Sequence, residues 1–281
     1  MGTLVSSATK EVIIGDGNPT VLIGERINPA GRKKLQEALK KGDLEIVQKE
    51  AVSQAEAGAD ILDISVGTFG VDEVELLPRV VQLLIETVDL PLCIDSAYPE
   101  TIEAALKVYK GKALINSVTA EEHSLAKVLP LVKDYGAAVI GLLQDDEGIP
   151  KNSEQRLTIA RKLVERIEAA GIPQNDLIID CLSFAVGAAP ESGPAVIEAI
   201  RKIKVELGVN MTLGASNVSF GLPDRQLLNR AFVAMAIASG VSCLIVDVFK
   251  VRPAVLASDL ILGRDKYGRR YTEAYRQRQK L

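Results

Sequence analysis

Carboxylate, amide and hydroxyl side chains follow short apolar runs at regular places along the chain, and they point to its chemistry. The polar residues at the ends of these runs are Glu25, Arg26, Asn28, Asp63, Ser65, Asp95, Ser96, Asn116, Ser117, Gln144, Asp180, Ser183, Ser216, Asn217 and Asp247. A single Asp, Asn or Ser at such a place is equally well explained as a helix N-cap. Capping alone does not account for seven consecutive runs, so we interpret these residues as the lining of one polar pocket.

An Asp- and Asn-lined pocket suits a planar ligand that is rich in nitrogen. A carboxylate accepts two hydrogen bonds from an amidine-like edge, and an amide both donates and accepts. A pterin ring presents such an edge through N3–H and its exocyclic amine. The run ends carry no His, Lys or Cys nucleophile, which disfavours covalent catalysis.

Composition excludes several other classes of site. The chain has 281 residues, of which 47% are hydrophobic and 25% charged, as in a globular protein. Its single histidine cannot build a multi-histidine metal site, and Cys93, Cys181 and Cys243 are too far apart for a CxxC-type zinc site. The net charge of −4 offers no basic surface for nucleic acid. Sparse cysteines and the lack of a long apolar run lead us to expect a cytoplasmic protein.

Alternation of short apolar runs with longer amphipathic segments predicts the fold. Strands are expected over 21–26, 61–67, 91–96, 113–118, 137–144, 176–182, 210–217 and 243–249, and helices over 44–57, 72–87, 99–109, 121–135, 153–170, 193–207, 224–239 and 252–262. Eight strand–helix repeats predict an α/β protein of the (β/α)8 TIM-barrel type. A doubly wound open sheet is the alternative, and no GxGxxG motif follows the first strand to favour it. In a barrel the strands' carboxyl ends meet at one face, where the polar residues would gather.

The two ends of the chain are expected to add little to the barrel. Residues 1–281 are predicted to form one domain, because no linker-like segment divides them. A short strand over 12–14 and the turn leading into the first barrel strand predict a hairpin that closes the barrel bottom. The charged segment after Gly263 is predicted to be a solvent-exposed tail.

Six motifs in chain order extend the pterin interpretation. They read LIGERINPAGRKKL (22–35), DILDISVG (60–67), LCIDS (92–96), ALINSV (113–118), IIDCL (178–182) and TLGASNVSFGLPDRQLLNRAF (212–232). With these motifs the chain resembles the methyltetrahydrofolate:corrinoid methyltransferases and the folate module of cobalamin-dependent methionine synthase over nearly its whole length. The resemblance implies a methyltransferase that moves a methyl group between N5 of tetrahydrofolate and the cobalt of a corrinoid.

The resemblance also implies roles for individual residues. Asn217 matches the asparagine that contacts N5, and it is the catalytic residue that we predict. The implied pterin-binding residues are Asp95, Asn116, Asp180, Asp63, Gly214, Ser216 and Arg225. Among these, Arg225 lies where the family has an arginine near the aminobenzoyl-glutamate arm. Asp63 belongs to the second-strand motif, in which relatives carry Asn at the position of Ser65.

Two alternatives share the barrel and the pocket. Dihydropteroate synthase usually carries an NxTPDSFSD-type first loop and a lysine after the seventh strand. Here the first loop is 28–32, Asn-Pro-Ala-Gly-Arg, and the seventh strand ends in Ser216 and Asn217 without a lysine. A non-catalytic pterin-binding protein would keep the same pocket, but the Asn217 that matches the catalytic position favours the enzyme.

The corrinoid is expected to arrive on a separate protein. Corrinoid modules that ligate cobalt through histidine use a DxHxxG motif, whereas His123 lies in Glu-Glu-His-Ser and is expected at the surface, at a helix start. The implied substrates are tetrahydrofolate or methyltetrahydrofolate, with cob(I)alamin or methylcobalamin as co-substrate on the corrinoid protein. No protein-bound metal, nucleic acid or membrane is expected, and the family implies a homodimer. Because catalysis lowers the barrier in both directions, either direction of transfer fits these residues.

Overall fold

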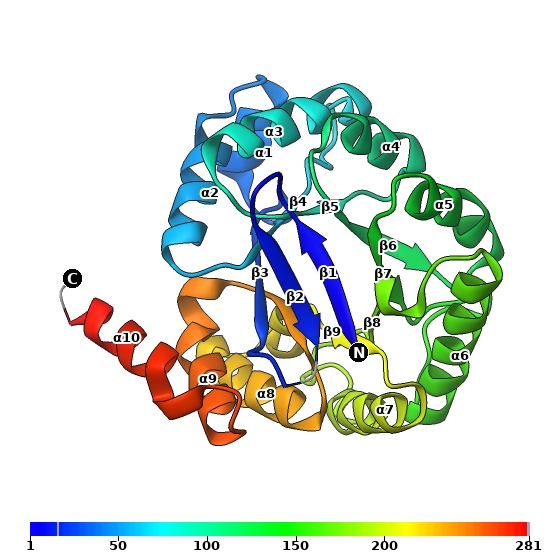
Figure 1. Ribbon diagram of the computed structural model, residues 1–281, viewed down its shortest axis with the longest axis vertical. Helices are drawn as coiled ribbons and strands as arrows, with labels where there is room; N and C mark the ends of the chain where they lie inside the picture. The colour runs from blue at the N-terminus through cyan, green and yellow to red at the C-terminus, as the bar shows by residue number, and fades with distance from the viewer. Residues whose placement is uncertain (16, 280–281) are drawn as a thin grey trace.

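A ring of eight parallel strands forms the centre of the molecule, and helices surround it (Figure 1). The computed structural model describes residues 1–15 and 17–279. The ring strands are β3 (Val21–Ile27), β4 (Ile61–Ile64), β5 (Leu92–Asp95), β6 (Leu114–Thr119), β7 (Ala138–Leu142), β8 (Leu177–Asp180), β9 (Asn210–Thr212) and β10 (Cys243–Val246). β10 pairs with β3, and a parallel bridge from Gly214 to Ile245 closes the ring beyond β9. The predicted (β/α)8 barrel is confirmed, and the open sheet is wrong.

The helices that cover the ring mostly lie where the amphipathic segments predict them. They are α1 (Lys33–Lys40), α2 (Glu45–Glu56), α3 (Glu73–Thr87), α4 (Pro99–Val108), α5 (Glu122–Asp134), α6 (Ser153–Ala169), α7 (Ser192–Leu207), α8 (Arg225–Ser239) and α9 (Val248–Ile261). α1 is not predicted by the sequence; it forms because Leu35 and Leu39, one helical turn apart, are both buried. α9 begins at Val248, four residues before the predicted start. Among the described residues, no helix combines the length and the apolar character that a membrane span requires.

Helix α3 illustrates how the sequence specifies these elements. The Asp72 carboxylate caps its N-terminus by accepting hydrogen bonds from the backbone amides of Val74 at 3.0 Å and Glu75 at 3.2 Å. Its buried face consists of Leu76, Leu77, Val80, Val81 and Leu84, which recur at helical spacing. The cap fixes where the helix starts, and therefore also fixes the loop that joins α3 to β4.

The interior of the ring is apolar toward the amino ends of the strands. The buried side chains gathered there are Val21, Ile23, Ile61, Cys93, Leu114, Ala138, Ile140, Ile178 and Cys243. Because successive side chains of a strand point to opposite faces, residues two apart on one strand both point inward. The next inward position of each strand is therefore known from this apolar set.

A hairpin closes the ring at the amino ends of the strands, as predicted. β1 (Gly2–Ser6) pairs antiparallel with β2 (Glu11–Gly15), and the pair crosses the ring in Figure 1. The expected pairing of this segment with the first barrel strand is wrong, since β2 pairs with β1 instead. The Asn210 amide, fully buried in β9, holds the hairpin by donating to Thr3 Oγ1 at 3.0 Å and to the Ile14 carbonyl at 2.9 Å.

The segment after Gly263 is mostly exposed, as predicted, but it is folded rather than a loose tail. Its residues form a 3-10 turn (Lys266–Gly268) and α10 (Arg269–Arg278), which lies against α9. The fully buried carboxylate of Asp259 on α9 forms ion pairs with Arg264 at 3.7 Å and Arg270 at 3.5 Å. These ion pairs hold the segment against α9, a contact that its polar composition does not predict.

Candidate active site

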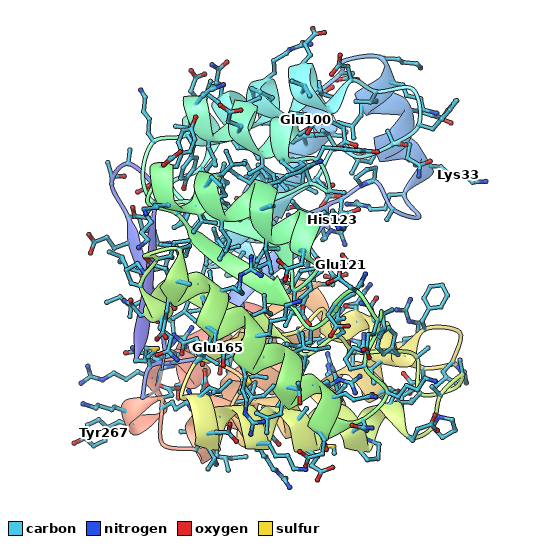
Figure 2. All side chains as sticks on the ribbon, turned by 90° about the vertical axis from the view of Figure 1, so that its right-hand side faces the viewer. Lys33, Glu100, Glu121, His123, Glu165 and Tyr267 are labelled. Carbon is cyan, nitrogen blue, oxygen red and sulfur yellow. The ribbon has the colours of Figure 1, made fainter. Side chains whose placement is uncertain are left out.

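A layer of polar side chains lies inside the ring, directly above its apolar layers. It occupies the inward positions at the carboxyl ends of the strands: Glu25, Asp63, Asp95, Asn116, Asp180 and Asp247. Each follows an inward apolar residue by two positions, as Glu25 follows Ile23 and Asp63 follows Ile61. In Figure 2 the hairpin lies at one side of the molecule, while the labelled Lys33 and Glu121 lie toward the opposite side, where these strands end. We call that end the mouth.

Two hydrogen bonds tie the layer together between β3, β4, β5 and β6. The Asn116 amide donates to Asp63 Oδ1 at 3.1 Å, and the Asn28 amide donates to Asp95 Oδ2 at 3.2 Å. Burial raises the pKa of both carboxyl groups, and for Asp95 the neighbouring charges of Asp63 and Glu73 raise the pKa further. Buried carboxyl groups of this kind are stabilised by hydrogen-bond donors, which the edge of a nitrogen-rich ring supplies.

Asp180 ends β8 and is held by backbone amides. Its Oδ1 accepts from the amide of Leu182 at 2.7 Å, and the Gly214 amide also donates to its carboxylate. Burial raises the pKa of Asp180 to about 6, against the lowering effect of these two hydrogen bonds. Leu182 adopts the left-handed conformation, with φ of 55°. This conformation is strained for a non-glycine residue, and the hydrogen bond from the Leu182 amide to Asp180 accompanies it.

Residues 214–219 carry the predicted catalytic asparagine. They follow β9 and form the 3-10 turn η2 (Ala215–Ser219), in which Asn217 is exposed at the mouth. A Cβ on Gly214 would lie 3.2 Å from Asn217 Nδ2, so the glycine leaves room for that amide. Ser183 Oγ donates to the Gly214 carbonyl at 2.7 Å and fixes the start of the turn.

Arg225, the first residue of α8, braces η2 from outside. Its Nε donates to Ser219 Oγ at 3.1 Å, and its Nη2 donates to the Ser216 carbonyl at 2.8 Å. Its guanidinium also stacks 5.5 Å from the centre of the Phe220 ring. In this structure Arg225 therefore positions the turn that carries Ser216 and Asn217.

Glu25, like Asp247, is expected from the sequence only as part of the pocket lining, and the motifs give it no individual role. Ser216 Oγ donates to Glu25 Oε1 at 2.9 Å. Burial, helped by the charges of Asp247 and Asp63, raises the pKa of Glu25 to about 7. The available signal was its register: Glu25 continues the inward series that begins with Val21 and Ile23. The same alternation places Asp247 two residues past Ile245 on the neighbouring strand.

A cavity of about 770 Å³ opens at the mouth beside Asp95. The loops after β4 and β5 form its walls, and they include the exposed aromatic side chains Phe69 and Tyr98. This volume falls in the range of cavities that hold a small ligand.

The structure thus brings the predicted residues to one end of the barrel. Asp63, Asp95, Asn116 and Asp180 face inward, whereas Gly214, Ser216, Asn217 and Arg225 belong to the β9–α8 connection. His123 is exposed in the first turn of α5, as expected. Across residues 1–15 and 17–279, no three His, Cys, Asp or Glu side chains form a group that could hold a metal ion.

Comparison with known proteins agrees with this geometry. A family model described as pterin binding enzyme matches residues 24–247, from the residue before Glu25 to Asp247. The methylcorrinoid:tetrahydrofolate methyltransferase of Eubacterium limosum is 32% identical over 264 residues, which cover 92% of this chain and 96% of that protein. The methionine synthase of Mycobacterium tuberculosis is 33% identical over 262 residues, and the match covers 89% of this chain but only 22% of that protein.

Solved structures show the same fold. Dihydropteroate synthase from Yersinia pestis, in complex with a pterin–sulfa conjugate, superposes with a TM-score of 0.68. The match covers 94% of this chain and all of that chain, at 18% sequence identity. At this level of sequence identity the likeness shows that the two chains share the barrel fold, and nothing beyond the fold.

Proposed function

This chain belongs to the pterin-binding enzyme family, and on that premise we propose that it transfers a methyl group between N5 of tetrahydrofolate and the cobalt of a corrinoid on a separate protein. The observation that carries the proposal is the inward layer of carboxyl and amide groups, with Asn217 exposed beside it at the mouth. The Eubacterium relative, whose name states methyl transfer between a methylcorrinoid and tetrahydrofolate, supports it.

We infer that Asp95, Asn116 and Asp180 hold the pterin ring, and that Asp63 orients Asn116. The Asn116 amide is already turned by its hydrogen bond to Asp63, which leaves its carbonyl oxygen for a ring N–H. The buried carboxyl groups of Asp95 and Asp180 are costly to ionise, so N–H donors of a pterin would offset that cost on binding. The ring would thereby be fixed relative to the mouth.

Asn217 is the residue that we propose for the N5 contact. Cleavage of the methyl–N5 bond needs a proton or hydrogen bond at N5, because an uncharged amine is a far better leaving group than its anion. Cob(I)alamin, the co-substrate, is a strong nucleophile that needs no activation by this chain. The protein then contributes placement of the two reactants and selective stabilisation of the transition state. An exposed amide on a braced turn is suited to meet N5 at the mouth.

The likeness to dihydropteroate synthase supports a second candidate, the condensation of a pterin with an aromatic amine. The two activities predict different substrates and are separated by one assay. Protein is mixed with methylcobalamin and tetrahydrofolate, and then with cob(I)alamin and methyltetrahydrofolate, while the cobalt absorbance is followed. A change in either mixture supports methyl transfer. No change in both, together with formation of dihydropteroate from a pterin pyrophosphate and 4-aminobenzoate, would support the second candidate.

Substitution Asn217→Ala tests the assigned residue within the same assay. Loss of one donor aimed at developing charge costs about 3 kcal/mol, or roughly a 100-fold loss of rate. We expect a smaller loss of pterin affinity. The control is Asn18→Ala, an exposed asparagine in the turn after the hairpin, which should leave the rate unchanged. Single-turnover transfer at the wild-type rate in Asn217→Ala would remove the assignment.

We also propose that residues 1–281 form a single domain and that two copies form a homodimer in the cytoplasm. A corrinoid protein would bind transiently at the mouth of each copy. The support is the family relationship. Sedimentation equilibrium tests the dimer, and a monomeric mass at micromolar concentration would contradict it.

A further inference from the structure

Glu25 and Asp247 occupy adjacent inward positions where the ring closes. β3 and β10 pair in parallel, with Ile23 opposite Ile245 and Gly24 opposite Val246. Glu25 and Asp247 are the residues that follow this last pair, and the charge of Asp247 acts on Glu25, which indicates that the two carboxyl groups lie near each other at the mouth. Ser216, the chain neighbour of Asn217, reaches across β10 and donates its hydroxyl to Glu25 Oε1 at 2.9 Å.

Cations occupy one side of Asp247 and leave the other side free. Lys250 Nζ lies 2.8 Å and Arg26 Nη1 lies 3.5 Å from its Oδ2. Arg26 is chiefly committed to Glu50, which it meets through two hydrogen bonds of 2.7 and 3.1 Å. Asp247 Oδ1 is buried and has no hydrogen-bond partner among the described residues. A proton held on Glu25 would supply the donor that this oxygen lacks.

The charges around Glu25 keep it close to its titration midpoint. Asp247 on β10 and Asp63 on β4 repel its ionised form, whereas Lys250 on α9 and the Ser216 hydroxyl on η2 stabilise that form. Burial is the largest influence, and the net effect raises the pKa of Glu25 to about 7. A group with a pKa near neutrality gives and takes protons with similar ease at physiological pH.

We propose that Glu25 is the proton store of the methyl-transfer reaction and exchanges its proton with N5 of the folate through the Ser216 hydroxyl. The proposal rests on the proposed function. When the methyl group leaves methyltetrahydrofolate, the N5–methyl bond breaks, cob(I)alamin supplies the electron pair of the new cobalt–carbon bond, and N5 gains the proton that Glu25 loses. In the opposite direction N5 loses its proton to the Glu25 carboxylate as it takes the methyl group from methylcobalamin.

The nature of its partner distinguishes Glu25 from the other buried carboxyl groups. A hydroxyl passes a proton in either direction, because it accepts one as it donates another. Asp63 accepts from the Asn116 amide and from the thiol of Cys93, which lies in the apolar interior of the ring. Asp95 accepts from the Asn28 amide and Asp180 from backbone amides. None of these three carboxyl groups has a hydroxyl partner at the mouth among the described residues. Ser216 precedes Asn217 in η2, so the relay ends on the same turn as the group that we place at N5.

Single-turnover rates between pH 5.5 and 8.5 test the proposal. In wild type the transfer from methylcobalamin to tetrahydrofolate should rise with pH and level off above about 7, because it needs ionised Glu25. The transfer from methyltetrahydrofolate to cob(I)alamin should fall through the same pH. Glu25→Gln should lose this inflection and roughly 100-fold in rate, with pterin affinity retained. Glu147→Gln, at an exposed glutamate on another mouth loop, is the matched control and should behave as wild type.

The variant Asp247→Asn provides a second test, in which Glu25 is kept and the pH of the rate inflection is measured. Removal of one repelling charge should lower the pKa of Glu25, so the inflection should move to lower pH while transfer persists. A structural role for Glu25 would predict a slower Glu25→Gln enzyme with the inflection in place, and that result would overturn the proposal. So would an unmoved inflection in Asp247→Asn. Absence of transfer by wild type would instead overturn the proposed function itself.

Discussion

Substitution Asp180→Asn should raise the stability of the unliganded protein while it weakens pterin binding. Asp180 is 5% exposed, and burial raises its pKa from 3.8 to about 6. That rise corresponds to about 3 kcal/mol by which ionisation destabilises the folded state. An asparagine keeps the acceptor for the Leu182 amide but turns an NH2 group toward the Gly214 amide, which costs about 1 kcal/mol.

The sign of the pH dependence follows from the direction of the pKa change. Because the pKa of Asp180 is higher in the folded than in the unfolded chain, wild type loses stability as the pH rises from about 4 through about 6, and Asp180→Asn escapes that loss. At pH 7.5 the variant should be more stable by about 2 kcal/mol, and at pH 4 it should be less stable by about 0.5 kcal/mol. Urea unfolding over this pH range measures the difference, and calorimetry with tetrahydrofolate should show at least a tenfold weaker affinity.

The control for this prediction is Asp134→Asn, an exposed aspartate at the end of α5. It should change stability by less than about 0.5 kcal/mol at every pH. A difference between Asp180→Asn and wild type that stays constant with pH would refute the assignment of the raised pKa. Unchanged folate affinity would refute the proposed contact with the pterin.

Two further predictions concern the hairpin that closes the barrel. Asn210→Ala should lower the free energy of unfolding in urea by about 2–4 kcal/mol, because it leaves buried polar groups of the hairpin without hydrogen-bond partners. The control is Asn175→Ala, which removes an exposed amide that donates to the same hairpin at 3.3 Å and should cost under about 0.5 kcal/mol. Equal losses in the two variants would contradict this account. Gly111→Ala should destabilise the protein by more than about 3 kcal/mol for two reasons. The added Cβ would collide with the hairpin backbone at Ser6 and Ser7, and the alanine would have to adopt a positive φ. Gly31→Ala carries the conformational strain alone, about 1 kcal/mol, so similar thermal midpoints for the two variants would show that the contact is unimportant.

The barrel was predictable because its signal is local and repeated. Each strand–helix unit carries its own apolar run and amphipathic segment, and eight such units leave few alternatives. α10 and its preceding turn were not predictable in this way. The segment after Gly263 is polar in sequence and is held by long-range contacts, such as the hydrogen bond that Arg264 Nη1 donates to Thr20 Oγ1 at 3.1 Å. No periodicity records a contact of that kind.

The candidate site divides along the same line. Motifs identified Asp95, Asn116, Asp180 and Asn217, and the structure places all four at the mouth. The position of Glu25 depends on which of two alternating faces of β3 points inward, and on the neighbour that ring closure supplies. Strand register fixes both, and register is known only when the pairing partners are known.

Closure of the ring also constrains how the chain is made. Val21 of β3 pairs with Cys243 of β10, so roughly 220 residues separate the two, and on the order of 10 to 40 s of synthesis pass before the partner strand emerges. During that interval β3 has one unpaired edge, which is open to pairing with another nascent chain. An inward-pointing charge is a known safeguard against such pairing, and β3 carries one in Glu25. We therefore expect the residue that we assign to proton exchange in the finished enzyme also to disfavour such pairing in the unfinished chain.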